Sequence, residues 1–173
     1  MKWVNHLAIA GATTALISPP LVPIALLGST APDWLEWVLK AVGRPVKHRS
    51  VTHYVLGWVI GLAFAVGLWD FHGILTAFFW GGLTHVLADS LTVTGVPFSP
   101  YSDRRFHLFG GRLRTGEAGE YVIAWGLVAV CIGLGQLLYS SGDWYPFFYN
   151  WPDLYDQGLV DGKEWKDNRF RFF

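Results

Sequence analysis

Four long apolar stretches, separated by short polar segments, dominate the chain. They cover Leu7 to Leu27, Val51 to Trp69, Gly73 to Leu91 and roughly Tyr121 to Tyr139. Each has about the 20 residues that a helix needs to cross the ~30 Å hydrocarbon core of a bilayer. Because no water is present there to satisfy backbone N–H and C=O groups, an open chain must cross as helices. The pattern predicts an all-α, integral membrane helical bundle.

The first stretch contains Ser18-Pro19-Pro20 near its middle. The two prolines remove backbone donors and push the preceding residue out of the helical region. In one straight helix, His6 and Asp33 would lie about 40 Å apart at ~1.5 Å per residue. A turn at the prolines instead brings Asp33 back to the side of His6. We therefore expect a proline-broken first helical hairpin or re-entrant pair, followed by three further transmembrane helices.

Composition supports a membrane protein and excludes some kinds of site. Of 173 residues, 52% are hydrophobic and only 15% are charged, which is more apolar than a typical soluble domain. The 13 basic and 13 acidic residues balance, so no nucleic-acid partner is expected. The single cysteine, Cys131, excludes an internal disulfide and a cysteine-rich metal site. We expect one membrane-embedded unit over residues 1–140 and an aromatic-rich, interfacial C-terminal tail over residues 141–173.

The basic residues predict the orientation of the bundle. One group lies between the first and second stretches and another between the third and fourth: Arg44, Lys47 and Arg49, then Arg104, Arg105, Arg112 and Arg114. By the positive-inside rule both loops face the cytoplasm, in a multi-pass arrangement. The short turn Asp70-Phe71-His72 then faces the other side.

Histidines and acids gather at the cytoplasmic ends of these predicted helices. His85, Asp89 and Thr92 share one helical face because they are spaced i, i+4 and i+7. His48 and His53 are about 140° apart around an ideal helix, so both reach one centre only if His48 lies in the loop before the helix. Ser50 is the residue expected to cap that helix.

Further acids lie at the same level, after the first stretch and at the start of the fourth. Ionisable groups buried in a bilayer cost several kcal/mol unless they are paired or coordinated, and so they indicate a functional site. Glu36 and Glu117 accompany the candidate ligands of this layer, which are His6, Asp33, His48, His53, His85, Asp89 and Glu120. His72 and His107 are not counted among the ligands.

The ordered motifs resemble the YdjM family of inner-membrane-bound, metal-dependent hydrolases. The resemblance rests on His-Arg-x-x-Thr-His at 48–53 and His-x-x-x-Asp-x-x-Thr-x-x-Gly-Val-Pro at 85–97. It extends over roughly residues 6–125, to His6, Pro32-Asp33, Arg-Arg-Phe at 104–106, and Gly116 with Glu120. It implies a protein of the bacterial inner membrane. The family's motif at this point is Asp-x-Asp-His, whereas this chain has Asp33-Trp34-Leu35-Glu36. The second acid of the motif is lost, and Glu36 stands in place of its histidine.

The order of histidines and acids is also similar, more loosely, to that of zinc-dependent phospholipase C, an all-helical enzyme with a cluster of metal ions. This similarity implies hydrolysis of a phosphoester, with a lipid head group as one candidate substrate, at the cytoplasmic face of the membrane. Membrane lipid is accordingly an expected partner.

Imidazole and carboxylate ligands suit zinc, which we expect first, or manganese or iron. The number of candidate ligands is enough for one to three ions per chain, and paired ions could activate a water and clamp a phosphoryl oxygen. A carboxylate that does not bind metal, Glu36 or Glu120, could act as base. Thr52 and Arg49 are further catalytic candidates, and Arg49, Arg104 and Arg105 could hold a phosphate.

Two other functions fit the same residues. Histidine and aspartate on facing helices also suit a transporter or a proton or metal relay. The apolar middle of the second and fourth stretches favours a one-sided pocket instead. A non-catalytic membrane component of a larger assembly is the remaining alternative, and the altered segment after Asp33 is compatible with it.

Overall fold

The computed structural model describes residues 1–44, 46–70, 72–102 and 104–138. The predicted interfacial tail, 141–173, lies outside the described residues. The described part is mainly helical, in agreement with the predicted all-α class. Its elements are α1 Trp3–Ala15, η1 Pro19–Leu21, α2 Val22–Ala41, η2 Val51–His53, α3 Val55–Gly67, α4 Ile74–Ser90, β1 Val96–Pro97, β2 Arg105–Phe106, η3 Leu108–Gly110 and α5 Ala118–Leu138.

The first apolar stretch turns back at its prolines, as predicted. Helix α1 ends at Ala15, and the short 3-10 turn η1 leads into α2, whose N-terminal turn contains Pro23. Pro19 and Pro20 have no N–H to continue the hydrogen-bond ladder of α1, so the helix ends before them. The indole Nε1–H of Trp3 donates to Asp33 Oδ2 at 2.6 Å. Asp33 thus returns to the N-terminal end of α1.

Glycines allow α2 and α4 to cross at backbone contact. A Cβ added at Gly81 of α4 would lie 2.1 Å from the carbonyl oxygen of Ala25. A Cβ added at Gly28 of α2 would lie 2.1 Å from the carbonyl oxygen of Phe78. Small residues are typical of helix contacts inside membranes because they let two backbones approach closely. This crossing brings the chain near Ser29 against the last turns of α4, where the site lies.

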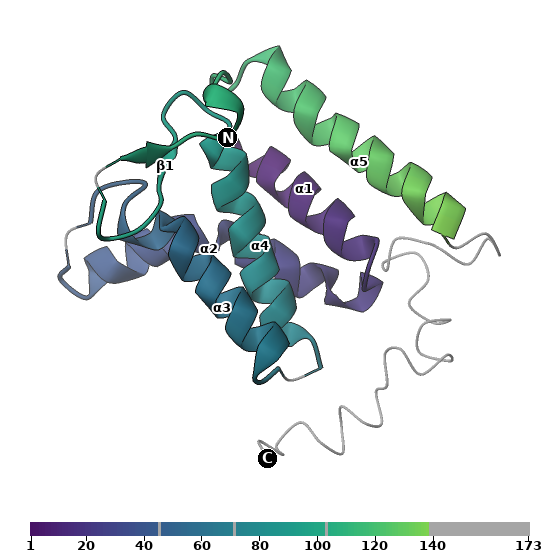
Figure 1. Ribbon diagram of the computed structural model, residues 1–173, viewed down its shortest axis with the longest axis horizontal. Helices are drawn as coiled ribbons and strands as arrows, with labels where there is room; N and C mark the ends of the chain where they lie inside the picture. The colour runs from purple at the N-terminus through teal and green to yellow at the C-terminus, as the bar shows by residue number, and fades with distance from the viewer. Residues whose placement is uncertain (45, 71, 103, 139–173) are drawn as a thin grey trace.

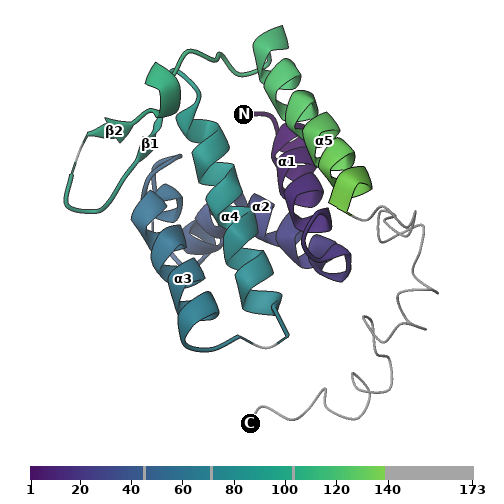
Figure 2. The ribbon, with the colours of Figure 1, turned by 45° about the vertical axis from the view of Figure 1, so that its right-hand side comes forward.

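Helix α4 is the central element of the bundle. Figure 2 shows it between α3 on one side and α1 with α5 on the other, and α4 contacts α1, α2 and α3. Gly82 makes room for the Trp58 ring and Gly61 for the Phe79 ring. Trp58, Leu83 and Val86 belong to the main apolar core, and ten of the seventeen α4 residues are buried.

The start of α3 differs from the prediction. The helix begins at Val55 with Tyr54 as its N-cap residue, and Ser50 instead precedes the separate 3-10 turn η2. The Ser50 hydroxyl donates to the carbonyl oxygen of Lys47 at 2.5 Å, so it does not cap α3. The expectation that Ser50 caps the helix is therefore wrong. The extra turn places His53 before α3 rather than within it.

Helix α5 packs along α1, and the two lie side by side in Figure 1. Between α4 and α5 the chain forms a small antiparallel hairpin, in which Val96 pairs with Phe106 and Pro97 with Arg105. This hairpin is an exception to the all-α prediction. It brings the arginine-rich loop back beside the C-terminal end of α4.

Among the described residues, α5 is the one helix that is both long and apolar enough to cross a membrane. Helix α3 has 13 residues and covers about 20 Å at ~1.5 Å per residue. The predicted count of three further transmembrane helices is therefore not confirmed. The outer faces of α3 and α5 nevertheless expose large apolar side chains, among them Ile60, Val66, Val122 and Leu137.

Candidate metal centre

Four ligand-type side chains from three elements meet at one point. Asp33 comes from α2, His53 from η2, and His85 with Asp89 from the last turns of α4. His53 Nε2 lies 3.5 Å from Asp33 Oδ1 and 4.0 Å from Asp89 Oδ2. His85 Nε2 lies 3.9 Å and 3.6 Å from the same two oxygens. In a tetrahedral site with bonds of ~2.0–2.1 Å, neighbouring ligand atoms are about 3.4 Å apart. The ligand atoms of Asp33, His53 and His85 all lie within 4.8 Å of one another and form a first group able to hold a metal ion, and Asp89 Oδ2 lies against both imidazoles.

The orientation of His85 follows from its other ring nitrogen. Nδ1 lies 2.6 Å from the backbone carbonyl oxygen of Ser29. A carbonyl can only accept, so Nδ1 carries the proton and the lone pair is on Nε2, which faces the carboxylates. Such a hydrogen bond commonly fixes the tautomer of a metal-binding histidine. The sequence has no signal for this contact, since the acceptor is a backbone atom on another helix.

A buried carboxylate orients His53. Glu36, which is 3% exposed, has its Oε1 3.3 Å from His53 Nδ1. The backbone N–H of Arg49 donates to the same oxygen at 2.8 Å. The arrangement matches the carboxylate–histidine pairs that position ligands around metals. Glu36 thus contacts the outer nitrogen of a candidate ligand, and its predicted role as base stays a prediction.

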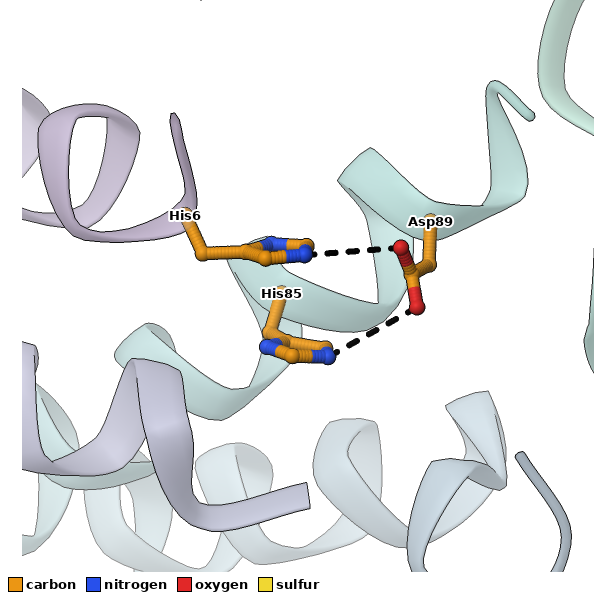
Figure 3. A group of neighbouring side chains, drawn as sticks. All are labelled: His6, His85 and Asp89. Atoms are coloured by element: carbon orange, nitrogen blue, oxygen red, sulfur yellow. Dashed lines mark ion pairs between the residues drawn. The ribbon is translucent and has the colours of Figure 1, made fainter. Parts of the chain in front are cut away.

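His6 joins the cluster from α1. Its ring stacks on that of His85, with centroids 3.7 Å apart and planes inclined by 9°. Figure 3 shows both rings directed at the carboxylate of Asp89, and His6 Nε2 lies 3.4 Å from Asp89 Oδ1. His6, His85 and Asp89 therefore form a second group able to hold a metal ion. The two groups share His85.

A buried arginine occupies the other side of Asp89. The guanidinium of Arg49 donates to Asp89 Oδ1 at 2.8 Å and to Thr92 Oγ1 at 3.2 Å. The amino group of Met1 also contacts Asp89 Oδ1. Oδ1 is therefore surrounded by donors, whereas Oδ2 faces His53 and His85. The shared face of His85, Asp89 and Thr92 agrees with the prediction from their spacing.

The site leaves buried nitrogen atoms without a hydrogen-bond partner. Nε2 of His53 and Nε2 of His85 are both fully enclosed and unpaired among the described residues. Buried polar atoms are nearly always satisfied, and an exception calls for an explanation. A cation held between these nitrogens and the two carboxylates would satisfy all four groups. The residues present fit a divalent metal ion.

The protonation states also suit metal binding. Burial would raise the pKa of Asp33, but His53, His85 and the Trp3 indole lower it to about 2. Burial lowers the pKa of His53, and this effect outweighs the opposing influence of the two aspartates. At neutral pH Asp33 is therefore a carboxylate and His53 a neutral imidazole. These are the forms that bind metals.

Two predicted ligands lie elsewhere. The His48 side chain is 64% exposed, and its Nδ1 lies 3.0 Å from Glu36 Oε2, outside both candidate groups. Glu120 is fully buried, but its oxygens accept hydrogen bonds from the Lys2 and Gly116 backbone and the Asn5 amide. Glu120 thus ties the start of α5 to the start of α1. Neither Asn5 nor Trp3 was expected near the site, although Asn5 is a polar neighbour of His6.

The remaining candidates lie at the edge of the site. Thr52 Oγ1 is 3.0 Å from His53 Nδ1 and 3.4 Å from Glu36 Oε1. Arg105 donates to the carbonyl oxygen of Arg49 at 3.2 Å, whereas Arg104 is exposed on the same loop. His107 lies against the carbonyl oxygen of Thr92. His72 is exposed at the opposite end of α4.

Comparison with known proteins identifies the family. The sequence model of the YdjM inner membrane protein family matches residues 1–142. The chain belongs to the YdjM inner membrane protein family. This confirms the predicted family and the predicted location in the inner membrane, and the YdjM match covers every residue of the candidate metal centre. No curated protein and no solved structure matches the chain.

Proposed function

We propose that this protein is a membrane-bound, metal-dependent hydrolase that acts on a phosphoester or a lipid head group at the cytoplasmic face of the inner membrane. The observation that carries the proposal is the pair of Nε2 atoms, on His53 and His85, that have no hydrogen-bond partner among the described residues and face the buried carboxylate of Asp89 and the partly exposed carboxylate of Asp33. A site of two imidazoles and two carboxylates suits zinc first, and manganese or iron next. A zinc ion in such a site supplies Lewis-acid chemistry that activates water at neutral pH.

The geometry favours one principal ion rather than three. His85 Nε2 has a single lone pair, so it can bind one ion at a time although it belongs to both candidate groups. A second ion near His6 would need Asp89 Oδ1, which already accepts from the Arg49 guanidinium. We therefore propose Asp33, His53, His85 and Asp89 as ligands of one ion that also binds a water as a fifth ligand, with His6 supporting His85 by stacking.

Arg49 supplies positive charge for an anionic substrate. Its side chain is 9% exposed and lies beside the ligand Asp89, and its backbone adopts a left-handed conformation with φ of 55°. Strained, non-glycine positions of this kind concentrate at functional sites. Guanidinium groups pair with phosphate in a bidentate manner. The Arg105 guanidinium donates to the Arg49 carbonyl oxygen and so places a second positive charge near the site. An anionic phosphoester is therefore a better match for this site than an uncharged ester.

The test is hydrolysis of p-nitrophenyl phosphate and of phosphatidic acid by the purified protein in lipid nanodiscs. We expect turnover that disappears with a chelator, returns with zinc, and falls at least about 100-fold in His53→Ala, since a ligand is lost. His72→Asn is the matched control, because asparagine tolerates the positive φ of 51° at this exposed position. Hydrolysis that is unaffected by chelation, or zinc-loaded protein that cleaves neither ester, would overturn the proposal.

A further inference from the structure

An apolar cavity of about 350 Å³ opens beside the candidate metal centre, between α2, α3 and α4. Its size lies in the range of about 300–1,000 Å³ that is typical of small-molecule sites. Among the residues that the structure describes, the walls carry no charged side chain, and most of the lining side chains are aromatic or aliphatic. The residues that define them are Leu35, Leu39, Tyr54, Trp58, Phe78 and Phe79.

Thr52 connects the cavity to the metal centre. It lines the cavity, and its hydroxyl also lies 3.0 Å from Nδ1 of the candidate ligand His53. The indole Nε1–H of Trp58 donates to the Thr52 carbonyl oxygen at 2.9 Å, which satisfies the indole. One end of the cavity therefore lies against Thr52, next to the Nδ1 side of the His53 ring, while its remaining surface is apolar.

The cavity extends along the helices, away from the site. Phe78 lies eleven positions before Asp89 in α4, which is about 16 Å along the axis at ~1.5 Å per residue. Val51 and Gly57, at the cavity rim, are exposed. An occupant that reaches both regions needs a polar head at the metal centre and a slender apolar tail along α3 and α4.

We propose that this cavity holds one acyl chain of a phospholipid whose phosphate group lies at the metal centre. The proposal rests on the proposed function and narrows its substrate class from phosphoesters in general to lipid phosphates. Continuity through Thr52 favours an amphiphile over a purely apolar ligand. The buried cation of Arg49, beside the ligand Asp89, favours an anionic head group. A lipid in the inner membrane has both parts.

Gly57 provides a way to fill the cavity without disturbing the fold. A Cβ added at Gly57 meets no atom of the described residues within 4 Å, and the same is true of Gly67, in the same helix but away from the cavity. Gly57→Leu and Gly67→Leu both replace a weak helix former by a strong one, so neither is expected to impair folding. They differ in whether the new side chain enters the cavity.

The first measurement is photo-cross-linking in nanodiscs that contain phosphatidic acid with a diazirine on one acyl chain, with labelled residues mapped by mass spectrometry. We expect labelling of Leu35, Phe78 or Phe79 in the wild type, a decrease of about tenfold in Gly57→Leu, and no change in Gly67→Leu. Labelling confined to the outward-facing Val66 and Val122, or equal cavity labelling in Gly57→Leu, would overturn the acyl-chain site.

The second measurement compares kcat/KM for phosphatidic acid with that for glycerol 3-phosphate, which has the same phosphoester and no acyl chain. The ratio should exceed one in the wild type and in Gly67→Leu and fall at least tenfold in Gly57→Leu. If the cavity is labelled but the protein turns over neither substrate, the proposed hydrolase activity is refuted and the proposed acyl-chain site stands. If the protein turns over its substrate, the cavity is not labelled and the kcat/KM ratio is unchanged in Gly57→Leu, the proposed acyl-chain site is refuted and the proposed hydrolase activity stands.

Discussion

Asp89→Asn is expected to weaken zinc binding by at least about 100-fold, beyond the 10–100-fold losses that follow removal of an outer partner of a ligand. Asp89 is 2% exposed, and its Oδ2 faces the Nε2 atoms of both His53 and His85. Asparagine keeps the shape of the side chain but removes the charge that attracts the cation. Competition with a fluorescent zinc chelator measures the dissociation constant.

The same substitution should also destabilise the metal-free protein. A neutral amide in place of the carboxylate could not neutralise the Arg49 guanidinium, which lies 2.8 Å from Asp89 Oδ1 and is almost fully buried. Breaking a buried ion pair in this way typically costs about 3–5 kcal/mol. Glu117→Gln is the control, since its exposed carboxylate pairs only loosely with Arg114. A zinc affinity of Asp89→Asn within threefold of the wild type would exclude Asp89 as a ligand.

Gly81→Leu should separate α2 from α4 and so disrupt both the fold and the site. Its Cβ would lie 2.1 Å from the Ala25 carbonyl oxygen and 2.8 Å from the Ser29 nitrogen. These are backbone atoms that cannot rotate away, so a loss of about 3 kcal/mol or more is expected. For a chain of this size the loss lowers the melting temperature by about 6–12 °C.

Thermal unfolding in detergent, together with zinc affinity, measures this effect. The site should weaken as well, because Ser29 accepts the hydrogen bond of His85 and Asp33 comes from the same helix. Gly126→Leu in α5 is the matched control, since a Cβ at Gly126 meets nothing within 4 Å in the described part of the chain. A Gly81→Leu protein that melts with the wild type and keeps its zinc affinity would disprove the close crossing of α2 and α4.

The parts of the site that depend on local spacing could be predicted from the sequence. His85 and Asp89 share a face because helical geometry puts i and i+4 together. The return of Asp33 to His6 followed from the inability of Pro19 and Pro20 to continue a helix. Both arguments depend only on local backbone geometry, namely the periodicity of a helix and the missing N–H of proline. Both agree with the structure.

The parts that depend on tertiary contacts could not be predicted. Glu120 has a carboxylate that could bind a metal, but this carboxylate accepts hydrogen bonds from Lys2, Asn5 and Gly116 instead. Lys2 and Asn5 are distant in sequence, so no local pattern around Glu120 predicts these partners. The shift of the α3 start from the predicted Val51 to Val55 has a similar origin, because the turn η2 packs against α2. Glu36, which replaces a family histidine, contacts His53 and His48 through the same packing.

Zinc K-edge X-ray absorption of protein loaded with one equivalent of zinc in nanodiscs tests the metal centre most directly. A site built from Asp33, His53, His85 and Asp89 predicts one retained zinc with five nitrogen or oxygen ligands at about 2.0–2.2 Å, four from the protein and one from water. Multiple-scattering features should correspond to two imidazoles. Zinc that washes out, or a bound ion whose spectrum lacks imidazole scattering, would contradict the assignment of this cluster as a metal centre.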